Sequence, residues 1–379
     1  MAGIYVHIPF CIRKCRYCDF VSFESIQKLE GYFDLLLAEA DLRAGECRAL
    51  EFQTVFLGGG TPSLLSGDQA ARLIVGLREQ YRVAKDAEIT IECNPGTLDA
   101  EKLQRYRKGG INRLSIGLQS THEELLTAIG RIHTFEDFLR THQQARSAGF
   151  ENINIDLMFG LPGQTWEQYQ NTLKTVISLG PEHVSAYSLT LEEHTPLHRL
   201  VERGELRLPD EDETFEMYEN GACLLEQAGY ARYEISNFAL PGKECRHNIN
   251  YWENGQYLGL GVAAHSSLRN GDSLVRSSNA VTLEAYSEAL LKCELPIASG
   301  ERIGAQQEMF ECVMLGLRMI KGINRGAFLK RFGITVESAY PDAIDILVRK
   351  GWLHADKDAL RLTPAGLNMQ NAALLEFMQ

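Results

Sequence analysis

Apolar, strand-like segments alternate with amphipathic segments over the first two thirds of the chain, and this alternation limits the fold more than any other feature. Six strand–helix units of this kind predict right-handed βαβ connections and a parallel sheet. Six units are two fewer than a closed eightfold barrel needs, so a partly open barrel and a doubly wound sheet both fit. The expected strands are residues 3–8, 54–58, 88–92, 113–118, 152–159 and 183–189, and the expected helices are residues 27–46, 67–81, 99–108, 122–128, 135–148 and 166–179.

Each expected strand is followed by unusual polar or glycine-rich residues. The carboxyl ends of parallel strands meet on one rim, which is where α/β folds place their active sites. The sequence therefore predicts a functional site on that rim. The residues concerned are the cysteine loop at 11–18, Gly58 to Pro62, Glu92 with Asn94 and Pro95, Gln119 with Ser120, Asp156 with residues 160–165, and residues 187–196.

The loop after the first strand, CIRKCRYCDF, carries Cys11, Cys15 and Cys18. Three thiolates on an iron–sulfur cube leave one iron without a protein ligand, and an open position is what a metal site needs in order to bind a small molecule. The neighbouring Arg13, Lys14 and Arg16 are expected to lower the thiol pKa. The alternative is a structural zinc site, which would need a fourth ligand such as His7 or Asp19.

Composition narrows the class of protein. The chain has 379 residues and nine cysteines. Its net charge of −12 argues against a generic nucleic-acid binder, which would normally be basic. We find no signal peptide and no membrane-spanning stretch, so a cytoplasmic location is expected. That compartment is reducing, so the cysteines are not expected to form disulfides. Cys47, Cys93, Cys223, Cys293 and Cys312 are interpreted as small buried hydrophobic residues.

The spacing Cys-x3-Cys-x2-Cys after the first strand resembles the signature of radical S-adenosylmethionine proteins. The resemblance implies a [4Fe–4S] cluster whose free iron is chelated by S-adenosylmethionine. It also implies a partial sixfold (β/α) barrel, which decides between the two folds left open above.

Further segments resemble the oxygen-independent coproporphyrinogen III oxidase-like subfamily: YVHIPFC, FLGGGTPS, IECNPGT, SIGLQS, DLMFGLPGQT and HNINYW. In this reading, glycines let backbone groups approach the cofactor and Glu92 accepts hydrogen bonds from ribose hydroxyls. The cofactor-binding residues that the resemblance implies are Tyr5, Tyr17, Gly59, Gly60, Thr61, Glu92, Gln119, Arg131 and Asp156.

These residues also have plain structural interpretations. The glycine run could be a tight turn, Arg131 a surface cation and Asp156 a helix cap. We interpret His7, on an apolar strand, as a core histidine with satisfied hydrogen bonds. The shared rim and the order of the motifs favour the functional interpretation for the others.

Two departures separate the chain from true oxidases of this subfamily. Those carry a further cysteine where Phe20 stands, and they have a long extension before the cluster loop, whereas ten residues precede Cys11 here. Both departures resemble a haem-chaperone branch of the subfamily, whose mark is His-Asn-x-x-Tyr-Trp. The residues implied to bind haem are His247, Asn248, Tyr251 and Trp252, with His247 as an iron ligand and Cys245 as the rival. The alternative is a polar turn over a buried Tyr-Trp pair.

Helical and hairpin patterns beyond residue 300 predict a small winged-helix-like domain. The expected domains are a partial barrel with the cluster loop (1–240), a connecting segment with the HNxxYW motif (241–300) and the C-terminal domain (301–379). The winged-helix pattern allows a nucleic-acid reader, but no basic stripe accompanies it.

Three functions therefore compete: a haem chaperone with a cluster and S-adenosylmethionine, a coproporphyrinogen III oxidase, and a nucleic-acid regulator. The resemblance favours the first, and oxidase activity is not expected. The expected partners are haem and acceptor haemoproteins, those of the respiratory chain among them, with a homodimer as one assembly and no nucleic acid.

Overall fold

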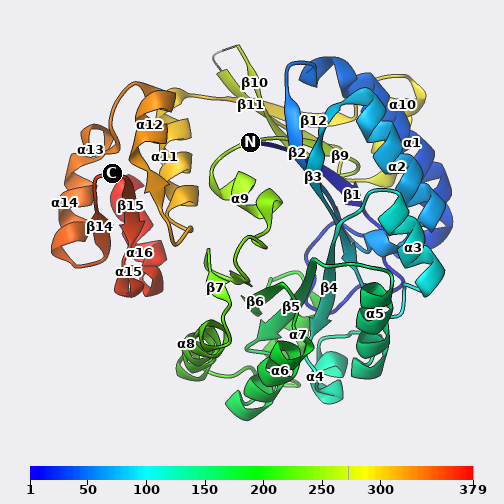
Figure 1. The fold of residues 1–379 in the computed structure, drawn as a ribbon, viewed down its shortest axis with the longest axis horizontal. Coiled ribbons are helices and arrows are strands. Elements are labelled where there is room, and N and C mark those ends of the chain that lie inside the picture. The colour runs from blue at the N-terminus through cyan, green and yellow to red at the C-terminus, as the bar shows by residue number, and fades with distance from the viewer. Residues whose placement is uncertain (272, 379) are drawn as a thin grey trace.

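The computed structural model describes residues 1–271 and 273–378. Its first two thirds contain the six predicted strand–helix units in the predicted order (Figure 1). The parallel strands are β1 (Ala2–Ile8), β2 (Glu51–Gly59), β3 (Arg82–Cys93), β4 (Arg113–Gln119), β5 (Ile153–Phe159) and β6 (His183–Ser188). The helices between them are α1 (Leu29–Arg43), α2 (Gly67–Gln80), α3 (Ala100–Lys108), α4 (Glu123–Ala128), α5 (Phe135–Ser147) and α6 (Trp166–Leu179).

The order of the strands confirms the partial barrel. β1 to β6 lie side by side in chain order, all parallel, within a sheet that ends at β12 on one side and at β7 on the other. A doubly wound sheet would reverse this order at a switch point. In Figure 1 the sheet curves around a central space, with the helices on its outside.

Further strands extend the sheet beyond both edges of the barrel, which was not predicted. β9 (Gln256–Leu260) pairs in parallel with β1, and antiparallel β10 (His265–Asn270), β11 (Ser273–Asn279) and β12 (Ile297–Ile303) follow it. β8 (Asn237–Ala239) and β7 (Ala231–Arg232) extend the β6 edge. The segment 241–300 therefore contributes strands to the barrel sheet. The domain boundaries at residues 240 and 300 remain a prediction. The helices of this part of the chain are α7 (Pro196–Glu202), α8 (Glu211–Gln227), α9 (Arg246–Trp252) and α10 (Leu283–Leu291).

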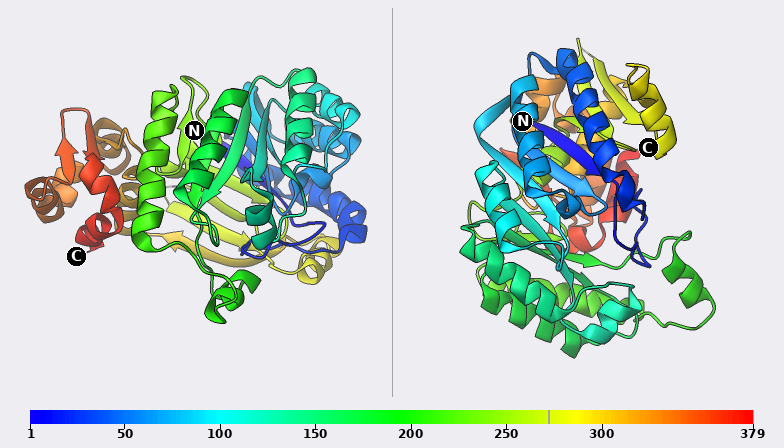
Figure 2. Two further views of the ribbon diagram at one scale, coloured as in Figure 1. Left: turned by 90° about the horizontal axis from the view of Figure 1, so that it is seen from below. Right: turned by 90° about the vertical axis from the view of Figure 1, so that its right-hand side faces the viewer.

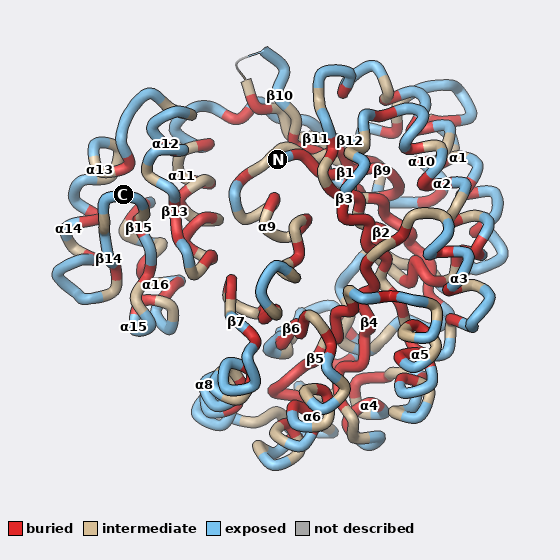
Figure 3. The backbone as a smooth tube through the Cα atoms, in the orientation of Figure 1, coloured by how far each residue is buried: buried red, intermediate tan, exposed pale blue. Residues whose placement is uncertain are grey.

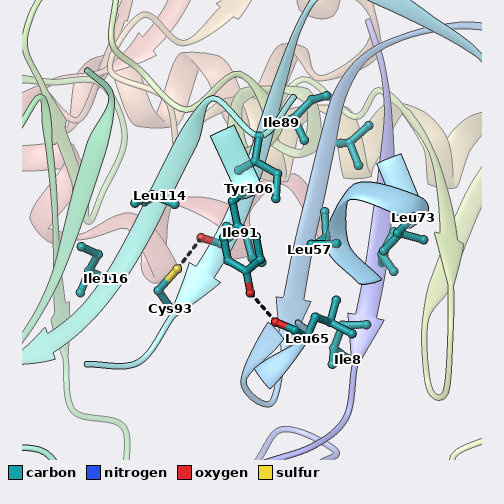
Figure 4. Close-up of a cluster of buried hydrophobic side chains, with 14 of the residues drawn as sticks. Ile8, Leu57, Leu65, Leu73, Ile89, Ile91, Cys93, Tyr106, Leu114 and Ile116 are labelled. Carbon is teal, nitrogen blue, oxygen red and sulfur yellow. Dashed lines mark hydrogen bonds between the residues drawn. The ribbon is translucent and has the colours of Figure 1, made fainter. Parts of the chain in front are cut away.

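The two faces of the barrel wall differ in polarity. In β4, Leu114, Ile116 and Leu118 pack into the hydrophobic core beneath the helices, whereas Ser115 and Gly117 on the other face line a cavity. Because successive side chains of a strand point to opposite faces, this alternation is built into the sequence. The barrel strands are largely buried, and the outer helices are exposed on their far sides (Figure 3). Figure 4 shows part of the core, with Tyr106 donating to the carbonyl of Leu65 at 2.7 Å.

The cysteines outside the loop differ in their surroundings. All nine are free thiols. Cys47 and Cys93 are buried, as predicted, and Cys312 is half-buried. The prediction is wrong for Cys223 and Cys293, which are exposed. Cys223 lies on the outer face of α8, and Cys293 adopts a left-handed backbone (φ 58°) just after α10, where the chain leaves the core.

The C-terminal domain has the predicted winged-helix-like arrangement (Figure 2). It has a hydrophobic core of its own. Its three-stranded sheet has the order β13-β15-β14, and the predicted hairpin turns at residues 356–358. No helix in the described part of the chain combines the length and the hydrophobicity that crossing a bilayer requires. The elements are α11 (Ala305–Gly316), β13 (Ile323–Asn324), α12 (Arg325–Phe332), α13 (Val336–Ala339), α14 (Pro341–Arg349), β14 (Leu353–Ala355), β15 (Ala359–Leu362), α15 (Pro364–Asn368) and α16 (Gln370–Leu375).

Candidate functional site

The cysteine loop is fixed to the carboxyl rim of the barrel by backbone hydrogen bonds. The amide of Cys11 donates to the carbonyl of Phe23 at 3.0 Å, and the amide of Arg16 donates to the carbonyl of Ile129 at 3.0 Å. Cys11, Cys15 and Cys18 all line one cavity of about 350 Å³. The structure therefore brings the three predicted ligands to one pocket at the rim.

The basic residues of the loop bind backbone carbonyls, and burial outweighs their predicted effect on the thiols. Lys14 does lower the pKa of Cys18, but less than burial raises it. Arg13 donates to the carbonyl of Gly130 at 3.1 Å, Lys14 to that of Phe20 at 2.8 Å, and Arg16 to that of Ala128 at 3.3 Å. Burial instead raises the pKa of Cys11, and it raises the pKa of Cys18 to about 11. Such thiols stay protonated until a metal displaces the proton.

A zinc site does not fit this geometry. His7, one proposed fourth ligand, has both ring nitrogens in use: Nδ1 faces the hydroxyl of Tyr5 at 2.9 Å, and Nε2 faces the carbonyl of Val21 at 2.8 Å. This confirms His7 as a core histidine. Within residues 1–271 and 273–378, no three His, Cys, Asp or Glu side chains converge closely enough to hold a single ion. A polynuclear cluster, whose thiolates bind separate irons, fits three cysteines around a cavity.

The glycine-rich turn after β2 forms another wall of the cavity, and two of its glycines are required by the backbone. A Cβ on Gly60 would lie 2.7 Å from the carbonyl oxygen of Phe10, too close to be accommodated. Gly59 has φ +114° and donates its N–H to Oε2 of Glu92 at 3.1 Å. The turn thus packs directly against the strand that leads into the cysteine loop, and Thr61 donates to Sγ of Cys11 at 3.5 Å.

Two carboxyl groups face each other across the barrel interior. Burial, and then the charge of Asp156, raises the pKa of Glu92 to about 8. Asp156 accepts hydrogen bonds from Oγ of Ser115 at 3.0 Å and from Nδ2 of Asn154 at 2.7 Å, and burial raises its pKa as well. Asp156 is therefore a residue of the barrel wall and does not cap a helix. The raised pKa of Glu92 favours its protonated form in the free protein.

Arg131 is a wall residue and not a surface cation. Its Nη2 donates to Oδ1 of Asn94 at 2.8 Å and to the carbonyl of Gly117 at 2.5 Å, and its Nη1 donates to Sγ of Cys15 at 3.6 Å. Gln119, at the end of β4, has φ 70°, a strained value for a residue with a side chain. Such strain clusters at functional sites and is consistent with a role at this cavity.

The structure brings together most of the predicted cofactor residues. Those that line the cavity with the cysteines are Tyr17, Gly59, Gly60, Thr61, Glu92, Gln119, Arg131 and Asp156. Tyr5 lies outside this group. The lining also includes Ser115 and Met158, which the sequence reasoning missed. Their signal was the period-two alternation of β4 and β5, which turns them to the same face as Gly117 and Asp156.

A second, inner cavity of about 250 Å³ adjoins the first and shares Gly59, Glu92, Ser115, Asp156 and Tyr187 with it. Tyr5 lines this inner cavity, as do His247, Asn248 and Tyr251. Three of the four HNxxYW residues are therefore brought to the interior of the barrel.

The α9 helix, which carries the motif, lies in the space enclosed by the curved sheet (Figure 1). The amides of Arg246 and His247 donate to the carboxylate of Glu88, each at 3.2 Å. Glu88 of β3 pairs with Thr54 of β2, and Thr54 pairs with Gly3, which is near the start of β1. These three residues mark the amino-terminal side of the parallel sheet. The helix is therefore at the amino-terminal end of the barrel strands, opposite the cysteine loop.

His247 is 1% exposed and tightly held. Its Nδ1 lies 2.8 Å from Oγ1 of Thr54, and its Nε2 lies 3.1 Å from the hydroxyl of Tyr251. Its ring stacks on Phe56 with centroids 5.1 Å apart. Burial lowers the pKa of His247 to about 3, so the ring is neutral and has a lone pair to offer.

Trp252 points away from the inner cavity. It lines a separate cavity of about 700 Å³ between α9 and the C-terminal domain, together with Met319 and Phe328. The guanidinium of Arg318 lies 4.6 Å from the centre of the Trp252 ring. The HNxxYW motif is thus divided between two cavities. Cys245, the rival ligand, is buried, and burial raises its pKa to about 12.

The residues present fit the groups implied for the rim. Three thiols around one cavity suit an iron–sulfur cluster with a free iron. The half-buried Arg131 guanidinium beside Cys15 suits a carboxylate, and the backbone of Gly59 and Gly60 lines the cavity. The room left by the missing side chains of these glycines is taken by His7 and Phe10, which corrects the prediction that it lets a cofactor approach. Residues 5–176 match the Radical SAM superfamily, and residues 304–368 match the HemN C-terminal domain. The fold and the site together define a protein of the radical S-adenosylmethionine class.

Similar proteins narrow this class. The chain is 35% identical to the Heme chaperone HemW of Bacillus subtilis, covering 100% of this chain and 99% of that protein. It is 35% identical to the Heme chaperone HemW of Escherichia coli, over 99% of this chain and 98% of the relative. Among solved structures, the coproporphyrinogen III oxidase HemN of Escherichia coli superimposes with a TM-score of 0.85 and 25% identity, covering 99% of this chain and 89% of the oxidase. The chain belongs to the HemW family.

Proposed function

We propose that this protein is a haem chaperone that binds haem and transfers it to acceptor haemoproteins, those of the respiratory chain among them. The observation that carries the proposal is His247, a neutral buried imidazole in the HNxxYW helix, in a chain that aligns end to end with relatives named heme chaperones. The proposal keeps the cytoplasmic location and the homodimer expected from the sequence.

A [4Fe–4S] cluster on Cys11, Cys15 and Cys18 is part of the proposal, with S-adenosylmethionine in the rim cavity. Such a cluster supplies one electron to the bound cofactor. Arg131 would hold the cofactor carboxylate, the backbone at Gly59, Gly60 and Thr61 its methionine part, and Glu92 its ribose hydroxyls. Tyr17, Gln119 and Asp156 would complete the pocket, and their common lining of one cavity supports this assignment.

Haem would bind at α9, with His247 as the iron ligand and Asn248, Tyr251 and Trp252 against the porphyrin. Tyr5 lies on the inner cavity between this helix and the rim. A neutral imidazole suits an iron ligand, and aromatic rings suit a porphyrin face. Trp252 now faces the cavity towards the C-terminal domain, so contact with all four residues would require α9 to shift.

Haem titration of the anaerobically purified protein tests the proposal. His247→Ala should weaken binding or change the Soret band, because the iron loses its imidazole, and the cluster absorbance should stay unchanged. The control is Cys245→Ser, which should leave the Soret band in place. An unchanged haem affinity and spectrum in His247→Ala would remove His247 as the ligand.

Coproporphyrinogen III oxidation is the second candidate, because the oxidase HemN superimposes over 99% of this chain. Phe20 argues against it. This side chain is 69% exposed at the edge of both cavities, where the oxidases carry a further cysteine. We expect no protoporphyrinogen IX from coproporphyrinogen III with the reduced cluster and S-adenosylmethionine, as judged by chromatography. Robust turnover that is lost in Cys15→Ala would establish the oxidase instead.

A further inference from the structure

The two nitrogens of the His247 ring are held by partners of different kinds. Nδ1 lies 2.8 Å from Oγ1 of Thr54, which is on β2 and fully buried. Nε2 lies 3.1 Å from the hydroxyl of Tyr251, which is on the same helix as His247 and half-buried. One partner is thus part of the rigid barrel wall, and the other lies four residues along α9, where side chains share a face.

The ring itself has no room to turn. Phe56 stacks on one face, with an interplanar angle of 25°. On another side, a Cβ at Gly3 would lie 2.9 Å from Cε1 of His247 and 2.7 Å from Oγ1 of Thr54, so the backbone of β1 already touches both. The Tyr251 ring meets His247 edge-on, with centroids 4.8 Å apart. Phe56 and Tyr251 both border the inner cavity, but Phe56 stands on the barrel wall, whereas Tyr251 stands on a short helix.

We propose that Thr54 and Tyr251 are positioning residues for His247 with opposite effects: Thr54 fixes the tautomer that turns the lone pair of Nε2 outwards, and the hydroxyl of Tyr251 occupies that lone pair until an iron displaces it. This inference rests on the proposed function, in which His247 binds haem iron. Nδ1–H donates to Thr54, as the second nitrogen of a metal-binding histidine usually donates to an acceptor. The hydroxyl of Tyr251 donates to Nε2, and that hydrogen bond must break before coordination.

The two hydrogen bonds should therefore change haem affinity in opposite directions when they are removed. Thr54→Val keeps the shape of the side chain but loses the acceptor, and should weaken haem binding about 10-fold or more, the usual effect of losing an outer-shell partner. Tyr251→Phe keeps the ring and frees Nε2, and should tighten binding by about three- to tenfold, the value of one net hydrogen bond.

The experiment is a haem titration of the full-length protein, with affinity and the Soret band recorded for each variant. Thr54→Ser retains a hydroxyl and should bind as wild type does, which separates loss of the hydrogen bond from poor folding. Tyr257→Phe is the matched control, because the Tyr257 ring packs on Tyr251 at 4.7 Å. It should leave affinity unchanged.

Affinity changes in the same direction for Thr54→Val and Tyr251→Phe would overturn the inference, because a purely structural role predicts loss in both. No change in either variant, with His247→Ala still losing haem, would overturn it and leave the proposed function standing. No effect of His247→Ala would overturn both.

Discussion

The guanidinium of Arg131 and the sulfur of Cys15 are joined by a hydrogen bond of 3.6 Å, so the pocket wall touches a proposed cluster ligand directly. Hydrogen bonds and positive charge near a cluster thiolate favour the reduced state. Arg131→Met should therefore lower the reduction potential of the reconstituted cluster by about 50 mV, which corresponds to roughly 1 kcal/mol for a one-electron couple. An EPR-monitored redox titration measures the potential, and an equal or higher potential would contradict the assigned contact.

The three loop cysteines should be needed individually for the cluster. Cys11→Ala, Cys15→Ala and Cys18→Ala should each abolish the [4Fe–4S] absorbance after anaerobic reconstitution, because each removes one of three ligands. The exposed Cys223 gives the matched control, and Cys223→Ala should leave iron and sulfide content unchanged. A full cluster in Cys15→Ala would refute the assignment.

Glu92 should make the stability of the free protein depend on pH. Its pKa is raised to about 8 in the folded state, chiefly by burial, from an ordinary value near 4.5. Between pH 4.5 and pH 8, Glu92 is protonated in the folded protein and ionised in the unfolded chain. The contribution of this group to stability is therefore greatest below about pH 4.5 and falls as the pH rises towards 8. The slope from this group is at most about 1.4 kcal/mol per pH unit.

Glu92→Gln should remove that contribution. Denaturant unfolding of the cluster-free protein at pH 6 and pH 8 measures it, and the variant should lose less stability over this interval than wild type. If the free energy of unfolding depends on pH in the same way in both proteins, the pKa of Glu92 is not raised in the folded state, and the prediction is wrong.

Gly60 should not tolerate a side chain. A methyl group there would meet the carbonyl oxygen of Phe10 at 2.7 Å, so Gly60→Ala should push the turn away from the strand end that leads to Cys11. We expect a stability loss of about 1–3 kcal/mol, typical of overpacking, together with poorer cluster assembly. In Gly31→Ala, where a Cβ has nothing within 4 Å, stability should be unchanged or higher, and equal behaviour of the two variants would contradict the packing argument.

Periodicity was enough to predict the barrel, because its buried strands are apolar and its helices amphipathic. The ends of α2 and α6 fall within one residue of the expected ranges. β10 and β12 were not predicted because they are polar, and β12 is exposed along most of its length at the sheet edge. Such strands are held by backbone pairing with β11, which leaves no apolar pattern in the sequence.

The rim residues could be predicted because they follow strands, but the direction of their side chains could not. Arg13 and Arg16 stand beside cysteines in sequence, yet they bind carbonyls of the neighbouring loop, and the cation that reaches a thiol is Arg131, far along the chain. The contact between His247 and Thr54 joins residues that are even further apart in the sequence, so no local pattern indicates it.

The placement of α9 at the amino-terminal end of the barrel sets the proposed haem site at a distance from the proposed cluster site. Along β1, from Gly3 beside His247 to His7 near the rim, the strand spans about 13 Å, and the cysteine loop begins further on. Because the inner cavity adjoins the rim cavity and shares Glu92 and Asp156 with it, the two proposed sites would lie along one continuous interior, kept apart by distance and not by a wall.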